Sequence, residues 1–244
     1  GLTDGALLAP LAFVLVAVTV VLHGFSLAPV ARLLGLTSKE PAGVILVGGS
    51  SWTSDLGEAL QEAGVPVVIT DRNWFRLREA RERGLPVYFG EFLSEATEHR
   101  LEMNRYGMIW ALSDNDDYNT LVCTNYAPEF GRNNVFQIGR NESSALARAL
   151  PETIGGRRIG TGLSFEEFQR RSMKSWEFVA TPLTEEFGPE DHFAEHPKAE
   201  RIAVIRSNGA VVVFKADFEP KMQAGDSILA MAKIELPVEK NEEA

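Results

Sequence analysis

Cysteine is almost absent from the sequence, and basic residues are outnumbered by acidic ones. The single cysteine, Cys123, excludes an internal disulfide and a multi-cysteine metal site, and we expect it to pack inside a helix. The chain has 24 Lys and Arg against 34 Asp and Glu, which gives a net charge of -10. Nucleic-acid-binding domains usually carry a basic surface, so we expect no nucleic acid partner.

Charged residues are scarce at the start of the chain, where the first forty residues contain only Asp4, Arg32, Lys39 and Glu40. An apolar run from Ala6 to Leu22, interrupted only by Thr19, continues to Phe25 and reaches the length needed to cross a bilayer. No basic stretch precedes it, so a signal peptide is not indicated. The basic residues after it predict that residues beyond about 36 are cytoplasmic.

A buried helix of a water-soluble core is the alternative interpretation of this run. We also expect the helix to end near Gly24 and Pro29, with His23 at the membrane interface. The run from Val20 to Leu36 (VVLHGFSLAPVARLLGL) resembles the last transmembrane helix of the NhaP-type cation:proton antiporters. The resemblance implies that residues 1–36 are the end of a transporter in the cell (inner) membrane and that further transporter helices precede them.

After Pro41 the pattern changes to short apolar runs that alternate with helical periodicity. We predict strands at Gly43–Val47, Pro66–Asp71, Pro86–Phe89, Met108–Leu112 and Asn134–Ile138. Leu56, Ala59, Leu60 and Ala63 recur at helical spacing after the first strand, and further helices are predicted at Trp74–Arg83, Ser94–Asn104 and Asp116–Phe130. This alternation predicts an α/β fold, a Rossmann-like doubly wound parallel sheet over residues 41–150.

A glycine turn follows the first strand, and an acid ends the second. Aligned with G-x-G-x-x-G, the turn keeps Gly48 but has Ser50 and Thr53 at the other two glycine positions. The hydroxyls of Ser50, Ser51 and Thr53 either assist phosphate binding or only cap the helix. Asp71 stands where a carboxylate binds the hydroxyls of an unphosphorylated ribose, which points to NAD(H) or an adenine nucleotide such as AMP or ATP.

Four motifs together resemble the N-terminal (TrkA-N) domain of the RCK family. They are VGGSS at Val47–Ser51, TDR at Thr70–Arg72, FGE at Phe89–Glu91 and ALSDNDDYN at Ala111–Asn119. The resemblance implies a nucleotide cleft lined by Gly48, Gly49, Ser50, Ser51, Thr53, Asp71, Arg72, Gly90, Glu91 and Ser113. It also implies a homodimer formed through the RCK domains. Asp114 or Asn115 is expected to cap a helix, and a cation site at Asp114, Asp116 and Asp117 is the alternative.

The remaining residues indicate a small, β-rich α+β domain over 160–237. We predict a strand at Trp176–Ala180, a hairpin at Arg201–Phe214 that turns at Asn208-Gly209, and a strand at Ser227–Met231. The stretches around Gly155–Arg158 and Gly188–Asp191 are interpreted as loops, and the whole region resembles the TrkA-C domain that follows TrkA-N in this family.

The combined interpretation is a nucleotide-sensing regulatory region of a Na+ or K+:proton antiporter. Two alternatives remain: the regulatory domain of a potassium channel or uptake system, and a membrane-anchored NAD-dependent oxidoreductase. No tyrosine is followed by lysine four residues later, and His23, His99, His192 and His196 fall outside the strand ends, so we expect no enzyme activity. We expect surface positions for His192 and His196, and no metal site.

Overall fold

The computed structural model describes residues 5–34, 42–139 and 154–234, and the chain separates into two compact units, Gly1–Glu40 and Pro41–Ala244. The first unit is one helix, α1 (Gly5–Leu33), with Pro10 and Pro29 inside it. The sequence predicted that the helix ends near Gly24 and Pro29, but α1 continues through both residues to Leu33. Proline removes one N–H and stiffens the chain, but in a long apolar helix the neighbouring hydrogen bonds hold the helix together.

The α1 surface is apolar along its length. A 24-residue stretch, Leu8–Ala31, has a mean hydropathy of 2.3, and none of it is buried within the structure. Two of its polar side chains bond to the helix backbone: the Thr19 hydroxyl donates to the Leu15 carbonyl, and the His23 ring lies 2.8 Å from the Thr19 carbonyl oxygen. The helix is long and apolar enough to span a membrane.

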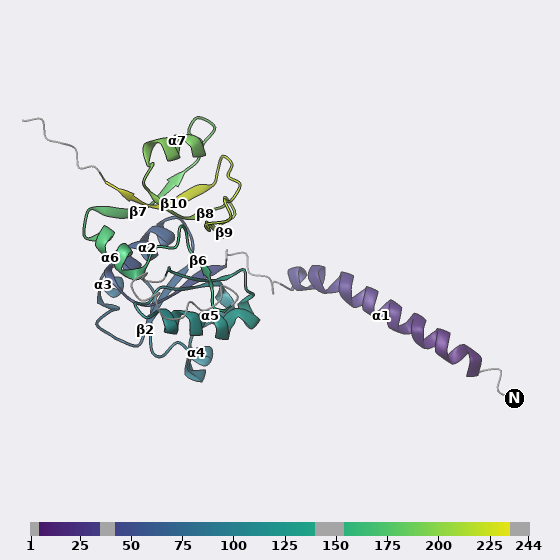
Figure 1. The fold of residues 1–244 in the computed structure, drawn as a ribbon. Coiled ribbons are helices and arrows are strands. Elements are labelled where there is room, and N and C mark those ends of the chain that lie inside the picture. The colour runs from purple at the N-terminus through teal and green to yellow at the C-terminus, as the bar shows by residue number, and fades with distance from the viewer. Residues whose placement is uncertain (1–4, 35–41, 140–153, 235–244) are drawn as a thin grey trace, which may run out of the picture. The chain divides into compact units, whose positions relative to one another are not determined.

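The second unit contains the predicted parallel sheet, with six strands in the order β3-β2-β1-β4-β5-β6. Figure 1 labels β2 and β6 of this sheet. The strands are β1 (Gly43–Val47), β2 (Val67–Asp71), β3 (Val87–Phe89), β4 (Tyr106–Ala111), β5 (Val135–Gln137) and β6 (Arg157–Arg158). The strand order reverses beside β1, which is the switch point where ligands of doubly wound folds bind. β6 corrects the sequence interpretation, which assigned Arg157–Arg158 to a loop: two arginines carry no strand pattern, and pairing with β5 makes the strand.

Helices connect the parallel strands. They are α2 (Ser51–Glu62), α3 (Arg78–Glu82), α4 (Glu95–Arg100), a short 3₁₀ helix (Met103–Arg105) and α5 (Asp116–Phe130). The bounds of α5 agree with the sequence prediction, whereas α3 and α4 are shorter than predicted. Arg76 and Leu77 form turns before α3, and Leu101 adopts an extended backbone after α4.

A second, antiparallel sheet has the strand order β7-β10-β8-β9. Its strands are β7 (Trp176–Pro182), β8 (Glu200–Ile205), β9 (Val211–Val213) and β10 (Ser227–Lys233). The predicted strands and hairpin are confirmed, but α6 (Phe165–Ser172) and α7 (Pro189–Glu195) were not expected. Gly188 and Pro189 are the N-cap and first residue of α7, so the pair that looked like a loop starts a helix.

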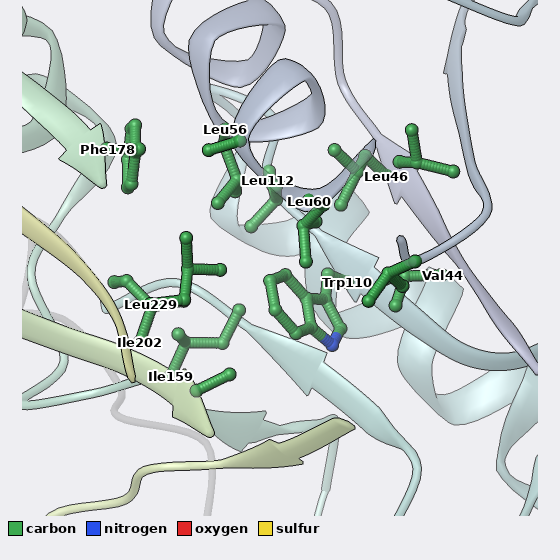
Figure 2. Close-up of a cluster of buried hydrophobic side chains, with 14 of the residues drawn as sticks. Val44, Leu46, Leu56, Leu60, Trp110, Leu112, Ile159, Phe178, Ile202 and Leu229 are labelled. Carbon is green, nitrogen blue, oxygen red and sulfur yellow. The ribbon is translucent and has the colours of Figure 1, made fainter. Parts of the chain in front are cut away.

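Three hydrophobic clusters hold the second unit together. One face of β1 and β4, with Leu46 and Trp110, packs with α2 and with Ile202 and Leu229 of the antiparallel sheet (Figure 2). The opposite face packs on α5, where buried Cys123 hydrogen-bonds to the Phe136 carbonyl and confirms the packing role predicted for it.

The third cluster lies on the other face of the antiparallel sheet, around Val204 and Ile228. All three clusters consist of residues after Gly43. The second unit therefore contains its own hydrophobic core, and the two sheets share the largest cluster rather than forming separate cores.

Candidate functional site

A cleft of about 350 Å³ opens at the carboxyl ends of the parallel strands. β1, β2 and β4 end in it, and the turns after β2, β3 and β4 complete its walls. The lining residues are Val47, Gly48, Thr70, Asp71, Arg72, Asn73, Arg76, Gly90, Phe92, Ser113, Asp114, Asn115 and Tyr118. The strand order reverses here, so the cleft has the position of a nucleotide site in a doubly wound fold.

Gly48 is required by the shape of the turn after β1. Its φ of 121° lies in the region that favours glycine, and a Cβ on it would lie 2.7 Å from the Cα and N of Ser113. The Gly48 N–H donates to the Thr70 carbonyl at 2.8 Å. The turn is thus pressed against the ends of both neighbouring strands, which brings three backbone segments together at the cleft.

The hydroxyls after this turn form a helix cap. The Ser50 Oγ accepts a hydrogen bond from Thr53 N–H at 3.1 Å, and the Thr53 Oγ1 accepts one from Ser50 N–H at 2.7 Å. This capping box satisfies two donors at the start of α2. Ser50 and Thr53 therefore adopt the capping role, one of the two alternatives that the sequence left open, and neither lines the cleft.

Asp71 is held by the backbone on two sides. Its Oδ2 accepts a hydrogen bond from Gly49 N–H at 2.8 Å, and its Oδ1 accepts one from Asn73 N–H at 2.7 Å. Each carboxylate oxygen has two lone pairs, so one on each oxygen remains for a ligand. The two bonds fix the carboxylate at the tip of β2, in the cleft wall.

Arg76 and Asp114 form a two-bond ion pair within the cleft lining. The guanidinium donates to the two carboxylate oxygens over 2.9 and 2.7 Å, which ties the segment after β2 to the turn after β4. The bond to Arg76 lowers the pKa of Asp114 below its usual value, and the bond to Asp114 raises the pKa of Arg76. Arg76 was not among the predicted site residues, because neither its spacing nor its neighbours in the sequence reveal a partner 38 residues away.

Glu91 follows β3, and Arg72 follows β2, the neighbouring strand. The Tyr118 hydroxyl donates to Glu91 over 2.5 Å, and burial and this bond raise the Tyr118 pKa well above its usual value. The Arg72 guanidinium lies 3.8 Å from the same carboxylate, and the arginine side chain is 76% exposed. Glu91 thus links the strand end to α5 and faces one cation, although it is not part of the cleft lining.

The turn after β4 is organised by Ser113 and Asn119. The Ser113 hydroxyl donates to the Asn119 side chain at 2.7 Å, and Asn119 donates back to the Ser113 carbonyl at 2.8 Å. Asn115 caps α5 by accepting from Tyr118 N–H at 2.9 Å. The predicted cap is therefore Asn115, while Asp114 is engaged by Arg76.

The structure brings half of the predicted site residues into the cleft lining. Those that line it are Gly48, Asp71, Arg72, Gly90 and Ser113; those that do not are Gly49, Ser50, Ser51, Thr53 and Glu91. Trp74, considered as a base-stacking residue, lies outside the lining, and its ring is covered by the Arg81 guanidinium at 3.7 Å.

His192 and His196 lie on and directly after α7. Within residues 5–34, 42–139 and 154–234 no group of three His, Cys, Asp or Glu side chains has a metal-binding arrangement. His192 was expected on the surface, but it is 1% exposed, because Pro189 starts α7 and His192 lies on the buried side of this helix.

The match to a known domain is specific for the parallel half of the second unit. Residues 44–151 match the TrkA-N domain. Residues 44–139, the described part of this match, include the glycine turn, Asp71 and the whole cleft lining. A comparison with curated proteins finds no match. A TrkA-N domain is therefore present at residues 44–151, and TrkA-N domains are Rossmann-type nucleotide-binding domains of ion transport systems.

Proposed function

We propose that the chain is the end of a monovalent cation:proton antiporter and its cytoplasmic regulatory region. In this proposal the cleft binds NAD(H) or an adenine nucleotide, and the bound state gates transport of Na+ or K+ in the upstream helices of the same protein. The observation that carries it is Asp71, fixed at the tip of β2 beside the glycine turn of a TrkA-N domain.

The cleft offers groups that a nucleotide uses. Asp71 has free lone pairs that accept from the two ribose hydroxyls, and its charge disfavours a phosphate on the ribose. α2 does not line the cleft, but it begins three residues after Gly48, which does, so its positive helix end favours a phosphate nearby. Thr70 lines the cleft with a buried hydroxyl that has no partner in the structure, and a ligand hydrogen bond there would satisfy it.

The membrane part of the proposal rests on α1. The span Leu8–Ala31 has 24 residues. At about 1.5 Å per residue it covers roughly 36 Å, more than the ~30 Å of a bilayer core. Its fully exposed apolar surface has no partner within the described residues, and lipid or other transporter helices would cover it. The resemblance of Val20–Leu36 to the last helix of NhaP-type antiporters favours an antiporter over a potassium channel.

The antiparallel sheet is positioned to respond to the cleft. Trp52, in the first turn of α2, stacks on Phe168 with 4.8 Å between ring centroids and also contacts Phe178 of β7. A shift of the helix start on nucleotide binding would therefore reach the second sheet through packed rings. In the proposed homodimer, two such units change their pairing, and the segment after α1 carries the change to the membrane.

Thermal unfolding of the fragment 39–244 tests the nucleotide part, since this fragment contains all three hydrophobic clusters. NAD, NADH, AMP or ATP should raise the midpoint, and NADPH should raise it less because of its 2′-phosphate. An absence of any shift with all five ligands, each at millimolar concentration, would reject nucleotide sensing.

A further inference from the structure

Arg76 and Asp114 belong to different loops of the cleft, and their ion pair joins these loops. Arg76 follows β2, where its backbone lies against the glycine turn: a Cβ on Gly49 would come within 2.8 Å of the Arg76 carbonyl oxygen. Asp114 follows β4 and precedes α5. The Arg76 backbone therefore lies beside the turn that receives phosphates in this fold. Its guanidinium, at the other end of the side chain, binds the Asp114 carboxylate.

The cleft has no surplus positive charge in this state. Its lining contains two cations, Arg72 and Arg76, and two carboxylates, Asp71 and Asp114. Arg76 is held by Asp114 through two hydrogen bonds, and Arg72 faces Glu91 at 3.8 Å. A phosphate that entered would meet Asp71 and Asp114 as well as the helix end, so it needs a cation released from its present partner.

We propose that Asp114 is an internal competitor for the phosphate of the ligand, and that a phosphate-bearing nucleotide takes Arg76 from it. This inference rests on the proposed nucleotide function and deepens it. A guanidinium fork binds carboxylate and phosphate in the same two-bond manner, so the exchange replaces one anion by another with more charge. The Arg76 and Asp114 side chains are 38% and 44% exposed, so a ligand can reach both.

The exchange gives the cleft two states that only a phosphate distinguishes. Without phosphate, the ion pair ties the segment after β2 to the turn before α5. With phosphate, Arg76 binds the ligand and the turn before α5 is released. A nucleoside lacks the phosphate, so it leaves the ion pair intact, and AMP breaks it.

Titration calorimetry on the full chain in detergent tests the exchange with AMP and adenosine as probes. The variants are Asp114→Asn and Arg76→Gln, with the exposed Asp117→Asn and Arg78→Gln as matched controls outside the cleft lining. Asp114→Asn should tighten AMP binding about threefold, the size of a lost exposed ion pair. Arg76→Gln should weaken AMP binding at least about tenfold, and adenosine affinity should stay within about twofold in both.

The outcomes separate this inference from the proposed function. An AMP affinity that is unchanged in both Asp114→Asn and Arg76→Gln would overturn the exchange and leave nucleotide sensing intact. An equal change for AMP and adenosine would also overturn it, because the phosphate would then play no part. Binding of neither probe by the unaltered protein would overturn the exchange, and the thermal test with all five ligands then decides nucleotide sensing separately. Circular dichroism of each variant is the control for folding, and we expect Arg76→Gln and Asp114→Asn to fold because both side chains are partly exposed.

Discussion

The Asp71 carboxylate accepts a hydrogen bond from the backbone N–H of Gly49, with 2.8 Å between nitrogen and Oδ2. This bond joins the tip of the second strand to the turn after the first, 22 residues earlier. The acid that would hold the ribose thus also shapes the turn that would face the phosphates. In the proposed site, one side chain therefore couples ribose recognition to phosphate recognition.

Replacing Asp71 with alanine should abolish the nucleotide-induced rise in unfolding midpoint. It should also lower the free energy of unfolding by about 1–3 kcal/mol, because two backbone N–H groups lose their acceptor. Thermal and urea unfolding of the fragment 39–244 measure both effects. The exposed Glu62→Ala is the control, and it should change neither. An undiminished ligand shift in Asp71→Ala would remove this residue from the site.

Gly48→Ala should destabilise the protein more than Gly64→Ala. Both glycines have positive φ, at 121° and 80°, but a Cβ on Gly48 meets the Ser113 backbone whereas a Cβ on Gly64 meets nothing within 4 Å. The conformational penalty of about 1 kcal/mol applies to both, and the clash adds roughly 1–3 kcal/mol at Gly48. Urea unfolding compares them, and equal losses would show that the turn is not pressed against β4.

Trp52→Ala should lower the free energy of unfolding by about 3–5 kcal/mol. Trp52 is 1% exposed and stacks on Phe168, so its removal leaves a cavity between α2 and the antiparallel sheet. Phe75→Ala removes an aromatic ring that is 84% exposed and should cost under about 0.5 kcal/mol. Similar losses in the two variants would contradict a core shared by the two sheets.

Acid should destabilise the second unit through His192. Burial, with His196 and Arg201 nearby, lowers the pKa of His192 to about 4, and neither ring nitrogen has a partner in the structure. In the unfolded chain His192 takes up a proton near pH 6.5, whereas in the folded protein it stays neutral down to about pH 4. The contribution of the neutral ring to the free energy of unfolding is therefore complete above pH 6.5 and is lost as the pH falls towards 4. Each unit of pKa difference between the unfolded and folded states corresponds to about 1.36 kcal/mol, so the free energy of unfolding falls by about 3 kcal/mol in total.

Urea unfolding at pH 7.5 and pH 5 measures this dependence. His192→Leu should remove most of the His192 contribution, so its stability should fall less between the two pH values than that of the unaltered protein. The exposed His99→Gln should retain the full dependence. An identical pH dependence in His192→Leu and the unaltered protein would show that this ring is not buried in the neutral form.

The sequence was sufficient for elements whose pattern is local. The buried strands around Ile45 and Ile69 alternate with helices, and the Asn115 cap starts α5 at the predicted residue. β6 was missed because its exposed arginines show no apolar pattern, and only pairing with β5 defines it. α7 was missed because a glycine-proline pair is equally common in loops.

The site was partly predictable for the same reason. Gly48 and Asp71 follow strands directly, so their place at the carboxyl edge can be inferred from chain order. Arg76 could not be found in this way, because its role depends on Asp114, which a different strand brings beside it. The shared core around Trp52 also depends on distant residues, and local patterns gave two separate domains instead.

Hydrogen exchange of the fragment 39–244, with and without AMP or NADH, tests the central claim most directly. If the cleft binds the nucleotide, the amides that slow should be those of the glycine turn and the tip of β2, around Gly49 and Asn73, whose N–H groups bond to Asp71. Protection confined to the antiparallel sheet, with no change around Gly49, would place the ligand elsewhere and contradict the account.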